Sequence, residues 1–303
     1  MPDRLTEFVR SMRADLLSSA SPRRRGRLLD IFRPVDLGLE DATVVVTGGS
    51  SGMGRAAALA FAREGARVAV LARDSVKLEA TVQDLRSAGS RDAVALAADV
   101  TESSQVGAAF ASLGEQWPHL NVLVNAVGPV DVGIGHFEGV SDEDWMATMR
   151  IGLVSAAVCV RAGLPLLRAA PWARIVNLSA HSTRRQSPGL IAYTASKAAL
   201  TSMSKNLSQT LAPDGILVNT VSPGSFLSQG LRDYLRGLPP ERGADPDDLR
   251  DAMRVIDEDF GHPAYLGRAG DPSEIGPVIA FVGSKVNSYM TGADINVDGG
   301  SDF

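Results

Sequence analysis

The chain has 303 residues, of which 45% are hydrophobic and 21% charged, so it can bury a sizeable core. A net charge of −5 and an isoelectric point near 5.4 argue against a nucleic-acid partner, which usually requires a basic face. The single cysteine, Cys159, excludes an intramolecular disulfide, and four scattered histidines show no metal-ligand spacing, so we expect no metal site. We find no apolar run approaching the roughly 20 residues of a membrane span and no signal-peptide core, and we therefore expect a cytoplasmic protein without membrane contact.

Residues 1–38 are expected to form a helical extension. Apolar residues recur there at helical spacing, and a Ser/Pro/Arg stretch follows at 18–25. Such a helix would pack on the body of the protein or on a second subunit. A membrane-surface role is the alternative interpretation.

From residue 43 onward, short apolar or β-branched runs alternate with longer helical patterns. Strands are expected at 43–47, 67–72, 93–97, 121–125, 173–179, 215–221 and 292–296. Helices are expected at 53–64, 75–88, 102–116, 141–168, 192–211 and 272–283. This alternation predicts an α/β fold, a doubly wound parallel sheet in a single domain over 39–303.

The polar region 226–268 interrupts this pattern. It carries two short helical patterns near 229–237 and 246–258. It follows a predicted strand, and open α/β sheets bind their ligands beyond the carboxyl ends of strands. We interpret it as an insertion that forms a lid over the substrate.

A glycine-rich turn joins the first predicted strand to the first helix, with the spacing G-x-x-x-G-x-G at Gly48, Gly52 and Gly54. Glycine allows a tight turn, close approach of the backbone to a pyrophosphate, and close packing of helix on strand. The helix N-terminus then offers N–H groups to the phosphates. This context predicts a dinucleotide-binding turn on a Rossmann sheet, although a plain structural turn is the alternative. The predicted cofactor-binding residues of the turn are Gly48, Ser50, Ser51, Gly52, Met53 and Gly54.

The turn Thr47-Gly48-x-x-x-Gly52-x-Gly54 resembles the fingerprint of the short-chain dehydrogenase/reductase family. Further pieces of the family pattern follow in order: Asp99-Val100, Leu123-Val124-Asn125-Ala126-Val127-Gly128, Tyr193-x-x-x-Lys197, Pro223-Gly224 and the ending from Thr291 to Gly300. The resemblance, closest to ketoreductase-type members, covers about residues 40–303. It implies an NAD(P)-dependent oxidoreductase that acts on a small molecule as a homodimer or homotetramer, with the helices near 141–168 and 192–211 forming the contact.

The tip of the second strand favours NADP(H) over NAD(H). In the family an acidic residue at this tip binds the ribose hydroxyls, and the corresponding residue here is Ala72. Arg73 follows and is suited to pair with a 2′-phosphate. The alternative is a solvated Arg73, with Asp74 as the ribose ligand.

The resemblance also implies the remaining cofactor contacts. Asp99 and Val100 would flank the adenine. Asn125, Ala126 and Gly128 would lie beside the nicotinamide ribose, although the family's usual Asn-Asn-Ala-Gly reads Asn-Ala-Val-Gly here. The segment that wraps the nicotinamide would contribute Pro223, Gly224, Phe226 and Ser228.

Tyr193 and Lys197 are the expected acid–base pair. They are four residues apart and so share one face of a helix. A phenol has a pKa near 10 and is a poor catalyst at neutral pH, and we expect the ammonium of Lys197 to lower the pKa of Tyr193. Tyr193 would then protonate a carbonyl oxygen during reduction, and Lys197 would also bind the nicotinamide ribose.

Two positions depart from the family pattern. The serine that usually lies 13 residues before the tyrosine is Ala180, and the candidates to replace it at the substrate are His181 and Ser182, either of which is alternatively a surface loop residue. The asparagine usual in the fourth helix is Gly152. Losing one oxyanion donor typically costs about 2.7–4 kcal/mol. Another donor, an activated substrate, or different chemistry must then compensate.

The sequence therefore predicts an NADP(H)-dependent oxidoreductase that interconverts a carbonyl and an alcohol. We expect a bulky, mostly apolar substrate if the apolar lid residues line the pocket, whereas their alternative role is to pack the lid helices. These residues are Leu231, Tyr234, Leu235, Leu238, Met253, Phe260 and Tyr265. The alternatives are non-redox net chemistry (isomerisation, dehydration or cyclisation), motivated by Ala180 and Gly152, and a weakly catalytic cofactor-binding partner.

Overall fold

The structure is a computed structural model that describes residues 35–129 and 132–301. The chain divides into two units, Met1–Leu37 and Gly38–Phe303, and the second unit contains the sheet and the helices that flank it. The helix predicted in residues 1–38 falls almost wholly outside the described residues.

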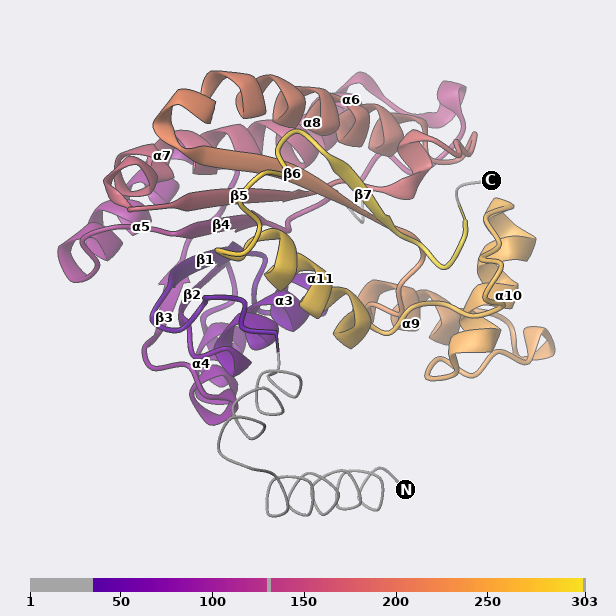
Figure 1. The fold of residues 1–303 in the computed structure, drawn as a ribbon. Coiled ribbons are helices and arrows are strands. Elements are labelled where there is room, and N and C mark those ends of the chain that lie inside the picture. Colours follow the sequence, from indigo (N-terminus) through magenta and orange to yellow (C-terminus); the bar gives the residue numbers. More distant parts are fainter. Residues whose placement is uncertain (1–34, 130–131, 302–303) are drawn as a thin grey trace, which may run out of the picture. The chain divides into compact units, whose positions relative to one another are not determined.

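Seven parallel strands form one sheet in the order β3-β2-β1-β4-β5-β6-β7, as Figure 1 shows. The strands are β1 (Thr43–Thr47), β2 (Arg67–Ala72), β3 (Ala93–Ala97), β4 (Val122–Asn125), β5 (Ala173–Leu178), β6 (Ile216–Pro223) and β7 (Asp294–Val297). Successive strands are added on one side of β1 up to β3 and on its other side from β4 onward, and doubly wound sheets bind dinucleotides at such a switch in strand order. The predicted doubly wound Rossmann fold is confirmed.

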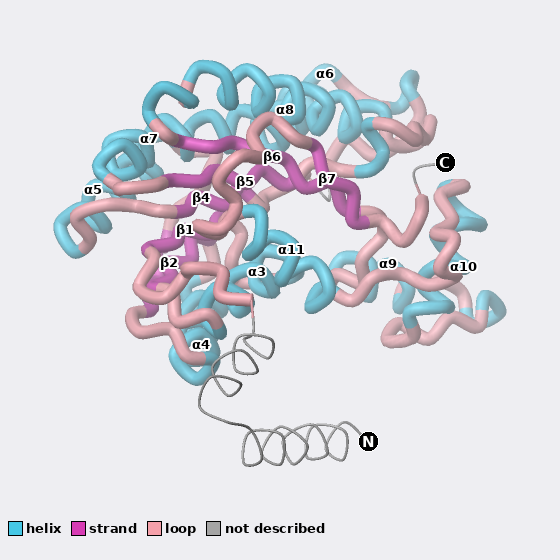
Figure 2. The backbone as a smooth tube through the Cα atoms, viewed as in Figure 1, coloured by secondary structure: helices cyan, strands magenta, loops and turns pink. Residues whose placement is uncertain are grey.

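Helices cover both faces of the sheet (Figure 2). One layer contains α3 (Gly52–Arg63), α4 (Ser75–Ala88) and α11 (Pro272–Val282), and the other contains α5 (Ser103–Gln116), α6 (Asp142–Met149), α7 (Ser155–Ala169) and α8 (Ile191–Thr210). Because both faces are covered, a central strand such as β1 is buried along its whole length and consists of Val and Thr. On the α5–α7 side, Val45, Leu123 and Ile175 of the strands form a core with Phe110 and Leu167 of the helices.

The predicted helix at 141–168 is not a single α-helix. A π-helical segment, η2 (Arg150–Val154), separates α6 from α7. Gly152 lies in this segment, and a Cβ added there would come within 2.3 Å of Ser196 Oγ on α8. Only glycine therefore allows the two helices to approach this closely, and π-helical turns of this kind are frequent at functional sites.

The same stretch corrects the expectation that no apolar run approaches the length of a membrane span. Together α6, η2 and α7 make a continuous helical stretch of 28 residues, Asp142–Ala169, whose most apolar window has a mean hydropathy of 1.6, and by length and composition alone it could cross a membrane. In the structure 44% of its most apolar window is buried, and α7 packs on β4 and β5. An apolar core helix of this kind accounts for the composition without a membrane.

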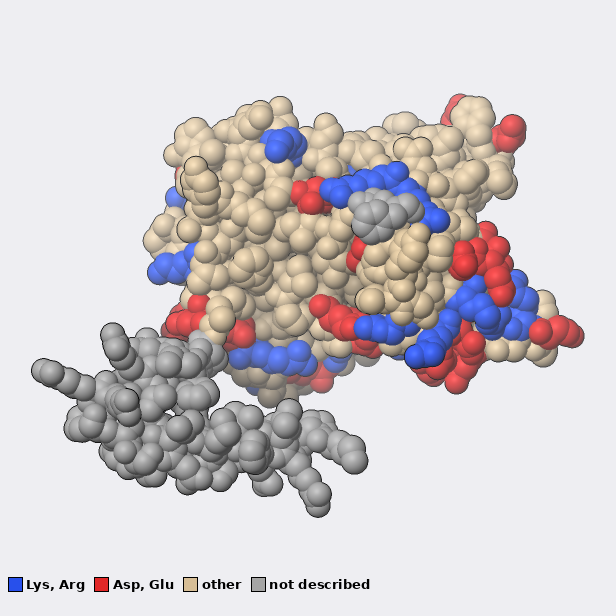
Figure 3. Space-filling model, turned by 45° about the vertical axis from the view of Figure 1, so that its right-hand side comes forward, with Lys and Arg blue, Asp and Glu red and all other residues tan. Residues whose placement is uncertain are grey.

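The region after β6 has a small core of its own. It contains α9 (Gln229–Arg236), η5 (Pro240–Arg242) and α10 (Leu249–Phe260). Leu235, Ala252, Met253 and Val255 are buried together there. Its outer surface carries ion pairs such as Arg242–Asp259 at 3.0 Å, and Figure 3 shows acidic and basic side chains lying next to one another along the lower part of the face drawn.

Candidate active site

The turn after β1 is built from backbone contacts that side chains would disrupt. Gly48 and Gly52 have φ values of 66° and 50°, in the left-handed region that favours glycine. A Cβ added to Gly54 would lie 2.4 Å from the Gly48 carbonyl oxygen. Gly54 therefore permits the close approach of α3 to the turn that the sequence predicted.

The N-terminus of α3 leaves room for an anion. Ser51 occupies the N-cap position in an extended conformation, and its side chain makes no capping hydrogen bond. Nothing lies within 4 Å of a Cβ added to Gly52, so the space beside the first helical turn is open. First-turn N–H groups at an open, uncapped helix end fit a pyrophosphate.

At the tip of β2, Arg73 and Asp74 have different roles. Asp74 caps α4, where its carboxylate accepts a hydrogen bond from the Lys77 amide at 3.0 Å. The Arg73 side chain is 81% exposed, and its nearest acidic partner is Asp99, at 3.9 Å. Asp99 in turn accepts two hydrogen bonds from Thr101; burial opposes ionisation of Asp99, but these bonds and the charge of Arg73 outweigh it and lower its pKa. Arg73 is thus the freer of the two residues to meet a ligand.

The end of β4 lies beside the predicted catalytic lysine. Thr47 accepts a hydrogen bond from the Ala126 amide at 3.2 Å, which ties β4 to β1. Asn125 donates to Asn177, while Asn125 Oδ1 is buried without a partner among the described residues. A Cβ added to Gly128 would lie 3.2 Å from Lys197 Nζ. The backbone of this segment and the lysine are therefore neighbours, as the family pattern implied.

Tyr193 and Lys197 both lie in the first half of α8, as predicted. Lys197 is buried, and its ammonium donates to the carbonyl oxygens of Leu178, at 2.8 Å, and Val127, at 3.4 Å. Two acceptors of this kind fix the side chain between the ends of β4 and β5.

The pKa values of Tyr193 and Lys197 are both shifted by burial. Burial raises the pKa of Tyr193 to about 12, and burial lowers the pKa of Lys197 to about 8. Desolvation disfavours the charged form of each group, and burial is the cause of both shifts. Tyr193 is consequently protonated at neutral pH.

A cavity of about 240 Å³ brings together parts that lie far apart in the sequence. Met53 comes from the glycine turn, Tyr193 from α8, and Pro223 and Gly224 from the end of β6. The three residues predicted as substrate contacts, Ala180, His181 and Ser182, line the same cavity. The predicted cofactor turn, acid–base residue and substrate segment thus meet at one place.

The segment after β5 supplies a hydroxyl other than that of the usual serine. Ser179 points toward α8, where its hydroxyl contacts the Lys197 carbonyl and the Thr201 hydroxyl. Ser182, in the short helix η3 (His181–Thr183), is buried and accepts a hydrogen bond from Thr194 at 3.2 Å. Because Ser182 accepts in that contact, its own proton is available for a substrate oxygen.

Several predicted site residues lie elsewhere or have other partners. Phe226 packs against Gly270, where a Cβ would lie 2.5 Å from its ring, and the Ser228 hydroxyl caps α9. Of the seven apolar lid residues, only Phe260 lines the cavity. Leu231, Leu235, Leu238 and Met253 pack the lid core, while Tyr265 is 77% exposed and Tyr234 hydrogen-bonds to Asp259. The apolar lining of the cavity thus comes mainly from other residues than the lid residues expected, among them Ile134, Leu190 and Ile256, and a bulky, mostly apolar substrate stays a prediction.

Sequence reasoning missed His262 at this cavity. It follows the lid helix α10, is buried, and lies against His181 with ring centroids 5.0 Å apart. No local pattern marks it, because His181 and His262 are 81 positions apart by their numbers and meet only when the lid folds back. Ile134, Leu190 and Ile256 also line the cavity without having been predicted.

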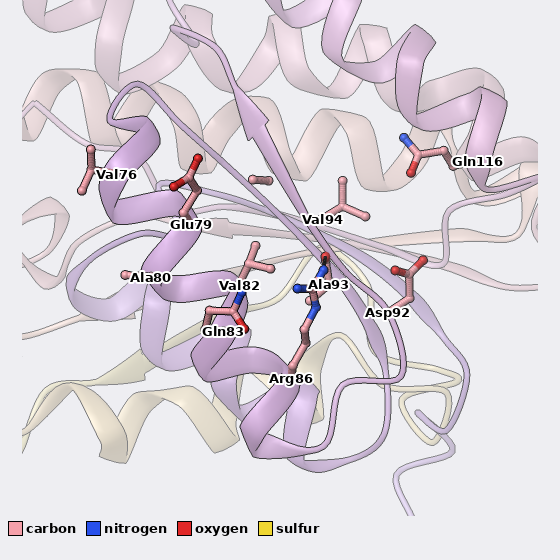
Figure 4. A pocket seen from close by; sticks show the side chains of 11 residues that line it. Val76, Glu79, Ala80, Val82, Gln83, Arg86, Asp92, Ala93, Val94 and Gln116 are labelled. Atoms are coloured by element: carbon pink, nitrogen blue, oxygen red, sulfur yellow. Dashed lines mark hydrogen bonds between the residues drawn. The ribbon is translucent and has the colours of Figure 1, made fainter.

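A larger and more open pocket, of about 660 Å³, lies at the β3 edge of the sheet (Figure 4). Val76, Glu79 and Arg86 of α4 line it, together with Asp92 and Gln116. Arg86 donates to the Ala93 carbonyl at 3.2 Å, and Asp92 accepts from Trp117 at 2.9 Å. None of the predicted site residues is among the described residues that line this pocket, and its Arg86 and Asp92 side chains have structural partners.

A Rossmann sheet with a glycine turn after β1 and a Tyr–Lys pair on the helix after β5 defines a class of nicotinamide-dependent oxidoreductases. A family model described as short chain dehydrogenase matches residues 42–236, and the chain belongs to this family. It is 31% identical over 281 residues to an uncharacterized oxidoreductase of Mycobacterium tuberculosis, covering 91% of this chain and 96% of the relative. It is 30% identical to the 3-oxoacyl-(acyl-carrier-protein) reductase of Staphylococcus aureus, covering 85% and 97%.

Solved structures agree with this assignment. L-sorbose reductase from Gluconobacter frateurii, complexed with NADPH and L-sorbose, superimposes with a TM-score of 0.82 at 26% identity, covering 88% of this chain and 99% of that one. RhlG of Pseudomonas aeruginosa, in a complex with NADP, gives a TM-score of 0.77 at 28% identity, covering 89% and 100%. The protein is therefore a short-chain dehydrogenase/reductase enzyme, as the sequence predicted.

Proposed function

We propose that the protein is an NADP(H)-dependent reductase that interconverts a carbonyl group and an alcohol. The observation that carries this proposal is the single cavity that joins the glycine turn, through Met53, to Tyr193 and to the end of β6. A hydride donor held along the turn and a proton donor on α8 then face the same small volume.

Each residue has a specific role in this proposal. Bound nicotinamide supplies or accepts the hydride. Tyr193, which is protonated at neutral pH, donates its proton to the substrate oxygen during reduction and takes a proton back during oxidation. The Lys197 ammonium, fixed by the Leu178 and Val127 carbonyls, is positioned to meet the ribose hydroxyls and to stabilise the phenolate that remains.

Ser182 is the proposed replacement for the usual serine. Ala180 lines the cavity but has no polar side-chain group, and the Ser179 hydroxyl is engaged with α8. Ser182 lines the cavity and has a proton to donate beside that of Tyr193. Two donors that converge on one oxygen stabilise the charge that develops there.

We infer a preference for NADP(H) from the tip of β2. The carboxylate of Asp74 is committed to the cap of α4, whereas the guanidinium of Arg73 is exposed. Two of the similar structures contain NADPH or NADP. A planar guanidinium binds a 2′-phosphate in bidentate geometry, so Arg73 favours the phosphorylated cofactor.

Titration of the purified protein with NADPH and with NADH, followed by cofactor fluorescence, tests this proposal without a known substrate. We expect NADPH to bind at least about tenfold more tightly, which corresponds to about 1.4 kcal/mol, and Arg73→Ala to remove the difference. A preference for NADH would overturn the role of Arg73, and binding of neither would overturn the proposed function. Alcohol formed in equal amount to NADPH consumed distinguishes reduction from a non-redox reaction.

We also propose a homodimer or homotetramer, with contact through α7 and α8. Ala198 and Ser202 of α8 are exposed and small enough for close helix contact, whereas Ser204 is buried and accepts from Asn177. Light scattering coupled to size exclusion tests this assembly, and a monomer would contradict it.

A further inference from the structure

Two histidines set the cavity apart from an apolar pocket. Nε2 of His181 and Nε2 of His262 are both buried, and neither has a hydrogen-bond partner among the described residues. The two residues are 7% and 3% exposed, and both line the cavity that Tyr193 and Ser182 share. Buried polar atoms are nearly always hydrogen-bonded in folded proteins, so two that lack partners at one cavity indicate a ligand.

The partners of the other ring nitrogens show what these two atoms offer. His181 Nδ1 lies 3.2 Å from the Pro223 carbonyl oxygen, which can only accept, so Nδ1 carries the proton. Burial and the neighbouring His262 lower the pKa of His181, and the ring is neutral at neutral pH. Nε2 of a neutral ring protonated at Nδ1 is a hydrogen-bond acceptor.

His262 presents the same kind of atom. Burial, the larger effect, lowers the pKa of His262, and a hydrogen bond with the backbone of Gln186 raises it. A hydrogen bond raises the pKa of a histidine when the ring donates, so the acceptor is the Gln186 carbonyl oxygen. The proton of the neutral ring is used in that bond, and Nε2 is left with its lone pair. The residues that line the cavity therefore carry two unpaired acceptors in addition to the donors Tyr193 and Ser182.

We propose that Nε2 of His181 accepts a hydrogen bond from a hydroxyl group of the substrate and that Nε2 of His262 accepts one from a further hydroxyl group, so that the site takes a carbonyl compound with hydroxyl groups near the carbonyl carbon. An apolar ketone would satisfy the two donors but leave both acceptors unpaired. The inference rests on the proposed function. Only if Tyr193 acts on the carbonyl oxygen do the histidines lie where they can bind a hydroxyl group next to that carbonyl. It adds the chemical class of the substrate.

The test compares matched ketones that differ by one hydroxyl group: hydroxyacetone against acetone, and acetoin against butanone. With NADPH and the full chain, we expect kcat/KM to favour the hydroxy compound on the order of 100-fold, because a site built to bind a hydroxyl rejects the analogue that lacks it. His181→Phe and His262→Phe keep a ring but remove the acceptor nitrogens. His181→Phe should reduce the preference to less than about tenfold, and His262→Phe should reduce it less, because the one hydroxyl group of these compounds donates to one acceptor. His181→Gln, whose amide oxygen also accepts, should restore part of it.

Controls separate this inference from the proposed function. His119→Phe, remote from the cavity, should leave the preference unchanged. NADPH fluorescence titration and thermal unfolding check that each variant is folded and still binds cofactor.

Equal kcat/KM for both members of each pair, as expected if the nitrogens hold only ordered water, would overturn the inference. A preference that survives both Phe variants, or turnover of none of the four ketones by a protein that binds NADPH, would also overturn it. Failure of the native protein to bind NADPH would instead overturn the proposed function.

Discussion

The two ends of the active site are built in different ways. At the cofactor end, the backbone itself forms the site, and a single Cβ on Gly54 would lie 2.4 Å from a carbonyl oxygen. At the substrate end, side chains form the site, and Ala180 and Gly152 replace the family's usual serine and asparagine. Backbone geometry tolerates little substitution, whereas a hydrogen-bond donor can be supplied from a neighbouring position. This difference explains why the family's glycine pattern is intact in this chain while its serine and asparagine are not.

The largest expected effect comes from removing the phenol at the substrate end. Tyr193→Phe should lower kcat for carbonyl reduction by about 10³-fold, within the range for general acid catalysis, because no other described side chain at the cavity is assigned its proton. NADPH affinity, measured by fluorescence, should change little. Retention of most activity would show that another group donates the proton, and would favour the alternative of a cofactor-binding partner with little catalysis.

Ser182→Ala tests whether the donor has moved from position 180. We expect kcat to fall by about 10²-fold, because one of two donors to the substrate oxygen is lost. Thr194 lies at the far side of Ser182, at 3.2 Å, and makes the matched control. Thr194→Val should cost much less activity, since it removes only the hydrogen bond that orients Ser182. The double variant Ala180→Ser with Ser182→Ala should recover activity if the two positions are equivalent, and no recovery would argue that they are not.

Gly54→Ala probes the cofactor end. The added methyl group must displace either α3 or the Gly48 carbonyl, and we expect NADPH to bind at least about tenfold more weakly, or about 1.4 kcal/mol. Gly107→Ala on α5 is the control, because nothing lies within 4 Å of its added Cβ. An alanine in a helix is more stable than glycine by about 0.5–1 kcal/mol, so this control should raise the free energy of unfolding. Equal cofactor affinity in both variants would contradict the proposed close packing.

Gly152→Ala tests the helix contact at the substrate end. Its Cβ would lie 2.3 Å from Ser196 Oγ and 2.8 Å from Ser196 Cβ, and overpacking of this kind costs about 1–3 kcal/mol. Ser196→Gly should relieve the clash, although it costs about 1 kcal/mol in helix propensity. Denaturant unfolding of both single variants and the double variant gives their coupling energy. Additive effects would show that the two positions do not contact.

The sequence predicted the strands, turns and helices that depend on patterns of neighbouring residues. The β-branched run of β1 and the Gly48–Gly54 spacing specify a strand, a turn and a helix, and these lie where they were expected. The π-helical segment at Gly152 was not predicted, and it lies against Ser196 on another helix, a contact that no local pattern reveals. His262 was missed for the same reason. The rise in the pKa of Tyr193 was not predicted, because spacing on a helix places a lysine nearby but does not reveal the effect of burial.

The lowered pKa of Lys197 gives the last prediction. Near neutral pH its expected effect on activity is the smallest of those predicted. Lys197 has its pKa lowered to about 8, so it is charged below pH 8 and neutral above, while Tyr193, at about 12, keeps its proton throughout. If reduction requires the ammonium, kcat/KM should be constant below pH 8 and then fall by about tenfold per pH unit. Lys197→Met should abolish this inflection and leave a low, flat profile. A wild-type profile that stays level to pH 10 would show that the phenol proton suffices, and that Lys197 acts by position rather than by charge.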